Sequence, residues 1–228
     1  MNTKYIYCLC FIALVLFASC RKWDEFKKFV SEGERIYTGK LDSVKIYSGK
    51  NRVRLTGMIK SDPKVKYMKV TWRDDMDSAI FNIRRTESAS IYIDTIINVS
   101  DEGIMNFKIR TYDEDNNPSV AVNAVGTSYG AIYRSKLTAR NILSKSFAAN
   151  QTTITWQTMD PFLGPEYTEI LYAQNGEAAV LQTPVSAPKS VLVGFDIRNE
   201  GFEYRTIYRP DSTSIDTFAT PFVYVPKN

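Results

Sequence analysis

The side chains that most often carry out catalysis are scarce in this sequence. It contains no histidine, and its three cysteines are Cys8, Cys10 and Cys20, all near the start. Without histidine, Ser-His-Asp catalysis, Cys-His catalysis and imidazole-bound zinc are excluded. Glycoside hydrolysis needs only two carboxylates. The acidic residues here cluster in expected turns, however, where no surrounding structure would raise the pKa of one carboxyl group and lower that of the other. We therefore expect a protein that is not an enzyme and that uses no metal or cofactor.

Two acidic runs could still supply oxygen ligands to a cation. One runs from Asp113 to Asn117 and the other from Asp74 to Asp77. Calcium accepts carboxylate and carbonyl oxygens in flexible geometry, but neither run has the spacing or the distal glutamate of an EF-hand loop. We expect both runs to be solvated turns, and calcium binding by Asp113–Asn117 stays open as the alternative.

The first residues have the layout of a secretory signal. Lys4 supplies a positive charge, residues 6–17 are almost all apolar, and the small Ala18 and Ser19 follow. This apolar run is shorter than the roughly 20 residues that a membrane-spanning helix needs. It therefore indicates an export signal, which would be removed with residues 1–19.

The end of this segment carries the first resemblance to a known class of proteins. Leu16-Phe17-Ala18-Ser19-Cys20 resembles the lipobox of bacterial lipoproteins, in which cleavage leaves the cysteine as a diacylated N-terminus. Two acyl chains anchor a protein stably, whereas one binds only marginally. The resemblance implies lipidation at Cys20 and attachment to the outer membrane. An ordinary secretory signal is the alternative.

The residues after the cysteine bear on where the protein is displayed. Arg21-Lys22-Trp23-Asp24-Glu25 resembles the surface-export signal of Bacteroidota lipoproteins and implies display on the cell surface. A solvated tether with chance charges is the alternative. Residues 23–32 then predict a short amphipathic helix, since Trp23, Phe26 and Phe29 recur at helical spacing.

Beyond the helix, apolar residues alternate with the period of β-strands. In the first half this holds for Val53, Leu55, Gly57 and Ile59, for Met68, Val70 and Trp72, for Ile91, Ile93, Ile97 and Val99, and for Met105, Phe107 and Ile109. In the second half it holds for Ile154 and Trp156, for the range 166–173, for Val191, Val193 and Phe195, and for the ranges 201–208 and 218–225. Glu102-Gly103 and Glu200-Gly201 each precede an aromatic strand, which indicates an internal repeat.

This pattern predicts an all-β chain of two antiparallel sandwiches. We expect a signal peptide at 1–19, a lipidated tether and short helix at 20–34, a first sandwich at 35–127, a linker at 128–141 and a second sandwich at 142–228. The tryptophan strand at 153–156 and the later run Gly201-Phe202-Glu203-Tyr204-Arg205 resemble fibronectin type III. In that family, which shares the immunoglobulin-like sandwich, the tryptophan is in the core and the late tyrosine secures a corner.

A second resemblance spans most of the mature chain. The runs 34–43, 52–57 and 204–210, with Ser214-Ile215-Asp216-Thr217-Phe218, resemble an uncharacterised family of Bacteroidota outer-membrane lipoproteins. The resemblance implies association with outer-membrane nutrient-uptake systems and carries no assigned activity.

Aromatic residues are the remaining candidates for a site, because exposed rings can stack on sugars. Trp72 and Trp156 fall on the inward parity of their strands, so we expect them in the cores, whereas Tyr67, Tyr92 and Tyr208 are expected at the surface. Loops at the end of a sandwich often bind ligands. Phe162 and Tyr167, which flank Gly164-Pro165, are therefore the ligand-binding candidates, unless these rings close the end of the second core.

Two functional hypotheses follow. The first is a non-catalytic, surface-exposed lipoprotein that acts as a binding or accessory module, with a glycan or an outer-membrane uptake complex as its partner. The alternative is a structural fimbrial subunit that assembles by strand addition. A formal net charge of +4 with no basic block argues against nucleic acid as a partner.

Overall fold

In the computed structural model, the described residues are 37–60, 62–84, 90–148, 150–195 and 200–227. Residues Thr38–Asn228 form one compact unit. Cys20 and the predicted helix at 23–32 lie outside the described residues. Within the described ranges, no helix is both long enough and apolar enough to cross a membrane.

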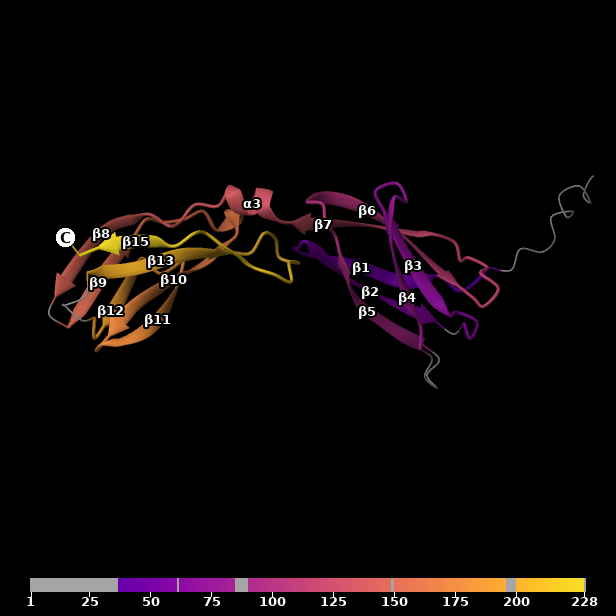
Figure 1. Ribbon diagram of the computed structural model, residues 1–228, viewed down its shortest axis with the longest axis horizontal. Helices are drawn as coiled ribbons and strands as arrows, with labels where there is room; N and C mark the ends of the chain where they lie inside the picture. The colour runs from indigo at the N-terminus through magenta and orange to yellow at the C-terminus, as the bar shows by residue number, and fades with distance from the viewer. Residues whose placement is uncertain (1–36, 61, 85–89, 149, 196–199, 228) are drawn as a thin grey trace, which may run out of the picture. The chain divides into compact units, whose positions relative to one another are not determined.

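The first half of the unit is a seven-stranded β-sandwich (Figure 1). Its strands are β1 (Leu41–Lys50), β2 (Arg52–Lys60), β3 (Tyr67–Trp72), β4 (Asp77–Asn82), β5 (Ser90–Asn98), β6 (Gly103–Tyr112) and β7 (Val122–Tyr129). The hydrogen-bonded order is β4-β3-β6-β7-β1-β2-β5, so one layer holds β4, β3, β6 and β7 and the other holds β1, β2 and β5. A parallel pairing of Gly49 and Lys50 with Ser128 and Tyr129 joins the layers.

The inward faces of these two layers form the first hydrophobic core. The predicted alternation is confirmed in β2 and β3, where Val53, Leu55, Ile59, Met68 and Val70 are all buried. Gly57 belongs to the same face because a Cβ there would lie 2.8 Å from Leu41 side-chain atoms. Burying such side chains stabilises the fold by roughly 1.5–3 kcal/mol each.

The second half forms another sandwich, from eight strands. They are β8 (Ile142–Ala148), β9 (Gln151–Trp156), β10 (Pro165–Gln174), β11 (Glu177–Pro184), β12 (Lys189–Val193), β13 (Gly201–Tyr208), β14 (Phe218–Ala219) and β15 (Val223–Pro226). One sheet has the order β12-β9-β8, and the other has the order β11-β10-β13-β14, with β15 also pairing with β13. The chain order of strands within the two layers is that of fibronectin type III, so the predicted fold class is confirmed. Gly103 and Gly201 begin equivalent strands, in agreement with the internal repeat.

Trp156 is buried in the second core, as the alternation of its strand predicts. Its indole N–H donates to Ser190 Oγ at 2.7 Å, and Ser190 Oγ donates to Thr183 Oγ1 at 2.7 Å. The sequence predicts that Val191 and Val193 of β12 face the core, and this prediction was wrong. Ser190 and Leu192 are buried instead, and the two valines are exposed. The φ of +67° at Gly194 bends the chain after the strand and returns Phe195 to the core.

The late tyrosines hold the chain that enters the second sandwich. Tyr204 donates to the carbonyl of Arg140 at 2.8 Å, and Tyr208 donates to the carbonyl of Thr138 at 2.7 Å. The surface prediction for Tyr208 was therefore wrong: it is 4% exposed, because it ties this entering segment to β13. Arg140 itself is buried and donates to the carbonyls of Gln157, Val185 and Ala187.

The segment predicted as a linker, 128–141, contains regular structure. Strand β7 extends to Tyr129, and α3 (Ala131–Ser135) follows it. The carboxylate of Glu102 accepts hydrogen bonds from the backbone N–H groups of Ile132 and Tyr133, at 2.7 and 2.6 Å. These bonds satisfy donors that a helix start leaves unpaired.

Candidate functional site

The predicted loop around Phe162 is a tight, well-braced turn. Residues Pro161–Leu163 form one turn of 3-10 helix, and Asp160 accepts a hydrogen bond from the N–H of Phe162 at 2.9 Å. The Phe162 side chain is 96% exposed, so it does not close the second core. Tyr167 lies in strand β10, opposite Ile207 and Pro184, and is half-buried. The two predicted residues therefore belong to different elements.

The acidic run at Asp113–Asn117 uses its first carboxylate inside the turn. Asp113 accepts from the backbone N–H of Asn117 at 2.8 Å and from its side-chain amide at 2.9 Å. The side-chain bond from Asn117 is the main reason that the pKa of Asp113 lies below its ordinary value. These contacts are those of the expected hairpin turn. Within the described ranges, no three acidic or cysteine side chains converge as they would around a metal ion.

A more unusual turn connects β3 to β4. Arg73, Asp74 and Asp75 have consecutive φ values of +54°, +53° and +66°, in the left-handed region. A non-glycine residue there costs about 1–2 kcal/mol. Asp75 compensates by accepting from the Thr71 hydroxyl and from Lys108 Nζ, the latter at 2.6 Å. The turn thereby fixes a carboxylate over β3 and β6.

The side chains beside this carboxylate form what we call the outer face. It comprises the outward residues of the central strands β3 and β6: Tyr67, Lys69, Thr71, Ile104, Asn106, Lys108, Arg110 and Tyr112. In the register, Tyr67 lies opposite Tyr112, Lys69 opposite Arg110, and Thr71 opposite Lys108. The Tyr67 and Tyr112 rings stack, with centroids 4.7 Å apart and planes at 3°.

Two hollows lie on the outer face. The larger, of about 330 Å³, is lined by Lys69, Thr71, Asp75, Lys108, Arg110 and Tyr112. The other, of about 260 Å³, extends from Asp75 and Lys108 to Trp72, Ile104 and Asn106. Both share Thr71, Asp75 and Lys108, so they adjoin. The volume of the larger hollow lies at the lower end of the range for small-ligand pockets, and that of the other lies just below it.

A third hollow, of about 640 Å³, opens between the edges of β4 and β5. Trp72 is among the residues that line it, and the buried indole N–H of Trp72 has no partner among the described residues. The β4–β5 connection includes residues 85–89, which lie outside the described part of the chain. The two hollows of the outer face, by contrast, are lined by described residues of β3, β6 and the β3–β4 turn.

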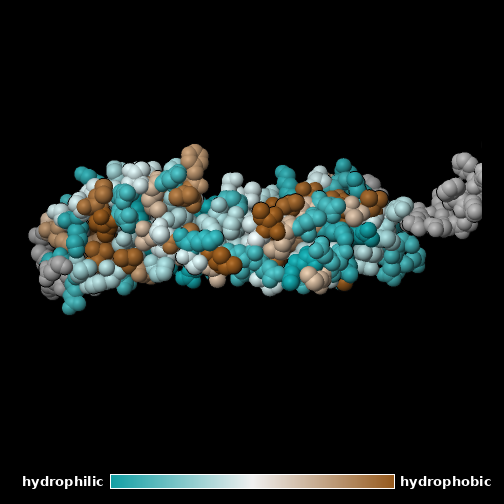
Figure 2. Space-filling view, turned by 90° about the horizontal axis from the view of Figure 1, so that it is seen from above, coloured by the Kyte–Doolittle hydropathy of each residue, from teal (hydrophilic) through white to brown (hydrophobic). Residues whose placement is uncertain are grey.

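On the side of the molecule that Figure 2 shows, exposed apolar residues of the described chain do not form one large patch. Figure 2 shows one side of the molecule, on which hydrophobic side chains gather in several separate groups among polar ones. On the sheet that carries the outer face, Ile80, Ile104 and Val125 are exposed. Protein interfaces usually have a contiguous apolar centre. The arrangement on the outer face, with its charges and hydroxyls, suits a polar ligand better.

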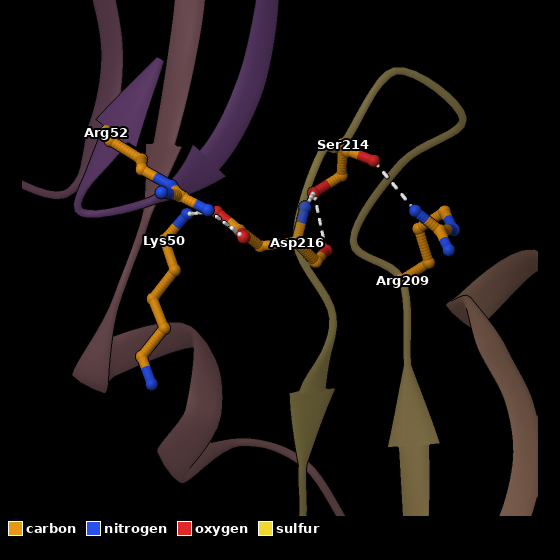
Figure 3. Close-up of polar contacts among 5 residues, drawn as sticks. All are labelled: Lys50, Arg52, Arg209, Ser214 and Asp216. Atoms are coloured by element: carbon orange, nitrogen blue, oxygen red, sulfur yellow. Dashed lines mark hydrogen bonds and ion pairs between the residues drawn. The ribbon is translucent and has the colours of Figure 1, made fainter. Parts of the chain in front are cut away.

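A second polar cluster joins the β13–β14 loop to the first sandwich (Figure 3). Asp216 accepts from Arg52 Nε at 2.9 Å and Nη2 at 2.5 Å, and from the N–H of Lys50 at 2.8 Å. The N–H of Ile215 donates to the carbonyl of Ser48 at 2.8 Å. At the base of the loop, Arg209 donates to the carbonyl of Ser214 at 2.8 Å. We call this cluster the loop clamp.

Two carboxylates of the β13–β14 loop are held in the charged form: Asp216 of the loop clamp, and Asp211, which accepts a hydrogen bond from Ser48 at 2.7 Å. The hydrogen bond from Arg52 lowers the pKa of Asp216 below its ordinary value. Burial raises the pKa of Asp211, but hydrogen bonds from Thr213, Ser48 and Tyr129 outweigh it, and the net shift is downward. Burial, followed by the bond to Asp211, raises the pKa of Tyr129 to about 12. The loop clamp is therefore a structural contact formed near neutral pH.

Sequence reasoning identified neither the outer face nor the loop clamp. The outer face had a local signal, because Lys69 and Thr71 in β3, and Lys108 and Arg110 in β6, alternate with buried residues. The loop clamp had none, since Arg52 and Asp216 are separated by 164 positions.

Comparisons with known proteins bear on the fold and the family. The model of a family described as a domain of unknown function matches residues 20–218. No curated protein matches the chain. Among solved structures, the chicken CNTN1 FN1–FN3 domains share 9% identity at a TM-score of 0.43, covering 83% of this chain and 68% of that one. A two-domain fibronectin type III segment of chicken tenascin shares 12% identity at a TM-score of 0.29, covering 82% and 97%.

Proposed function

This chain belongs to the DUF4998 family, and we propose that it is a non-catalytic surface lipoprotein that binds glycan through the outer face of its first sandwich. The anchor belongs to the proposal because Cys20 ends a lipobox-like run and is the last cysteine in the chain. In this proposal the protein belongs to a Bacteroidota outer membrane and supports a nutrient-uptake complex there.

One observation carries the binding part of the proposal: the outer face is open and has the chemistry that sugars require. Ile104 is 77% exposed at one end of it, and stacked Tyr67 and Tyr112 bound the other end. Hydroxyl, amide and charged groups of Thr71, Asn106 and Lys108 lie between them. Rings offer apolar surface to sugar C–H groups, while a few placed polar groups fix the orientation of a ligand.

The strands present in the two sandwiches favour a binding function over fimbrial assembly. The fimbrial alternative requires the form of strand addition in which a donated strand completes a sandwich that lacks one. In the described chain, the last strand of each sandwich is present: β7 pairs with β6, and β15 pairs with β13. A donated strand would have to displace one of these.

A glycan array tests the binding proposal, with residues 38–228 as the probe, because this unit is compact without the preceding residues. We expect signal for a subset of glycans, with loss in Tyr112→Ala and retention in Phe162→Ala and Tyr167→Ala. Loss in the latter two variants alone would move the site to the turn at residues 161–167. Absence of signal for every glycan would remove glycan binding as the function.

The anchor is tested separately in cells. Palmitate labelling of the full chain should be lost in Cys20→Ala, because the other cysteines, Cys8 and Cys10, would leave with the signal peptide. Label that persists in this variant would contradict acylation at Cys20.

A further inference from the structure

Two cations lie directly opposite each other at the centre of the outer face. Lys69 in β3 pairs with Arg110 in β6, and both side chains point outward. Directly opposed residues of an antiparallel pair have Cβ atoms about 4.5–5.5 Å apart, and like charges at such positions are destabilising. The fold therefore keeps an arrangement that does not favour its own stability.

Neither Lys69 nor Arg110 has an ion-pair partner of its own among the described residues; the charge of Asp75 acts on Arg110 only from a distance. Asp75 is the carboxylate that lines the hollow, and its oxygens accept from Lys108 and Thr71. Within the described ranges, no carboxylate lies within ion-pair distance of Lys69 or Arg110. The other arginines of the described strands each have one: Arg52 has Asp216, Arg54 has Asp94 and Arg205 has Glu169. The Lys69–Arg110 pair therefore has no direct ion-pair partner in the described chain, because Asp75 is bonded to Lys108 and Thr71.

The hollow beside the pair has the size and lining for one anionic group and part of its carrier. Its volume is about 330 Å³, and all of its lining residues are charged, hydroxyl-bearing or aromatic. An arginine fork can bind a carboxylate or sulfate through two parallel hydrogen bonds, and a lysine adds a point charge. Tyr112, held by stacking on Tyr67, supplies a ring at the same hollow.

The surroundings favour a saccharide as the carrier. Binding to nucleic acid or to anionic lipid uses clusters of cations, about 4–8 for a lipid surface, whereas the outer face has Lys69, Lys108 and Arg110, with Lys108 already paired. An acidic protein partner would leave the ring and the small hollow unused. A sugar acid uses both charge and ring.

We propose that Lys69 and Arg110 bind the carboxylate or sulfate of an acidic oligosaccharide in this hollow. The inference rests on the proposed glycan-binding function and narrows it to acidic glycans. Lys108 and Asp75 position the site: their ion pair anchors the β3–β4 turn at its rim.

The test measures binding of residues 38–228 by titration calorimetry with paired ligands. The panel contains uronate and sulfated oligosaccharides, each beside its carboxyl-reduced or desulfated counterpart. We expect each bound acidic ligand to bind at least about tenfold more tightly than its neutral counterpart, and the difference to shrink as salt screens the charges. Equal binding of both members would overturn the anionic inference and leave the glycan-binding proposal standing. Lack of binding by every member, acidic and neutral, would overturn both.

Two variants separate ligand binding from folding. Lys69→Glu places a negative charge opposite Arg110. We therefore expect binding of acidic ligands to be lost, while the midpoint temperature of thermal unfolding is unchanged or raised. Lys45→Gln, at an exposed position of β1 in the other layer of the sandwich, is the control and should bind as the wild type does. Retained binding in Lys69→Glu would contradict the inference, as would binding of anionic lipid vesicles in place of every oligosaccharide.

Discussion

The two core tryptophans show how a single hydrogen bond distinguishes similar residues. Trp72 and Trp156 are both buried, as the parity of their strands predicts. Trp156 donates to Ser190, whereas the Trp72 indole N–H has no partner among the described residues. The inward position of each tryptophan follows from the alternation within its own strand, which the local sequence shows. The hydrogen-bond partner of Trp156 lies 34 residues away and could not be predicted.

This difference predicts unequal costs for the same substitution. Trp156→Phe removes ring volume and also leaves the buried Ser190 hydroxyl short of a donor. Trp72→Phe removes the same volume but takes away an unpaired donor. We expect Trp156→Phe to lower the free energy of unfolding by about 1–2 kcal/mol more than Trp72→Phe. Urea unfolding of both variants measures this, and equal losses would show that the hydrogen bond has no net effect.

At the scale of elements, turns were predicted better than the faces of isolated strands. The run Asp113–Asn117 forms the expected turn between β6 and β7, in which Asp113 accepts hydrogen bonds from Asn117. The face of β12 was wrong because hydropathy favours Val191 and Val193, while the inward position is taken by Ser190, whose hydroxyl is satisfied in the core. Strand β4 was not predicted, because Ile80 and Phe81 are adjacent apolar residues without a clear alternation.

The turn that presents Phe162 depends on one glycine. Gly164 has φ +82°, and a Cβ there would lie 2.2 Å from the carbonyl oxygen of Arg209. The backbone is fixed at this contact, because the N–H of Arg209 donates to the carbonyl of Gly164 at 2.8 Å.

We therefore expect Gly164→Ala to lower the free energy of unfolding by at least about 2 kcal/mol, since the conformational cost adds to a backbone clash. Gly176→Ala is the matched control, because Gly176 has φ +91° but no atom within 4 Å of the added Cβ. It should cost only about 1–2 kcal/mol. Thermal unfolding of both variants gives the comparison, and a Gly164→Ala no worse than Gly176→Ala would refute the role of the contact.

At the scale of the whole molecule, the two cores were predictable and the contacts between distant segments were not. Alternation within each half is sufficient to place Val53 and Ile154 in separate cores. The loop clamp and the outer face depend instead on which strands become neighbours. Lys69 and Arg110 meet only because β3 pairs with β6, and Arg52 meets Asp216 only in the folded chain.

The loop clamp should weaken in acid. Arg52 holds the folded-state pKa of Asp216 below its ordinary value of 3.8, so the pair stabilises the fold above that pH and this contribution is lost as pH falls through the lower folded-state pKa. The Arg52 side chain is partly exposed, so we expect Asp216→Asn to cost about 1 kcal/mol or less at pH 7.

The measurement compares urea unfolding of Asp216→Asn and wild type at pH 7 and near pH 3. The difference in unfolding free energy should narrow at the lower pH, because protonation removes the charge that the substitution removes. The exposed pair Arg54–Asp94 supplies a control, since Asp94→Asn tests an ion pair outside the loop clamp. A difference for Asp216→Asn that stays constant with pH would contradict the contribution of the charged carboxylate.

Binding of an acidic glycan at the outer face of the first sandwich can be located by an amide-resolved NMR titration. Residues 38–228 are titrated with an acidic oligosaccharide selected by calorimetry, and the perturbed backbone amides are mapped on the strands. We expect the largest changes in β3 and β6, at residues 67–72 and 104–112, with little change at residues 160–167. Changes confined to residues 160–167, or spread evenly over both sandwiches, would contradict binding at the outer face.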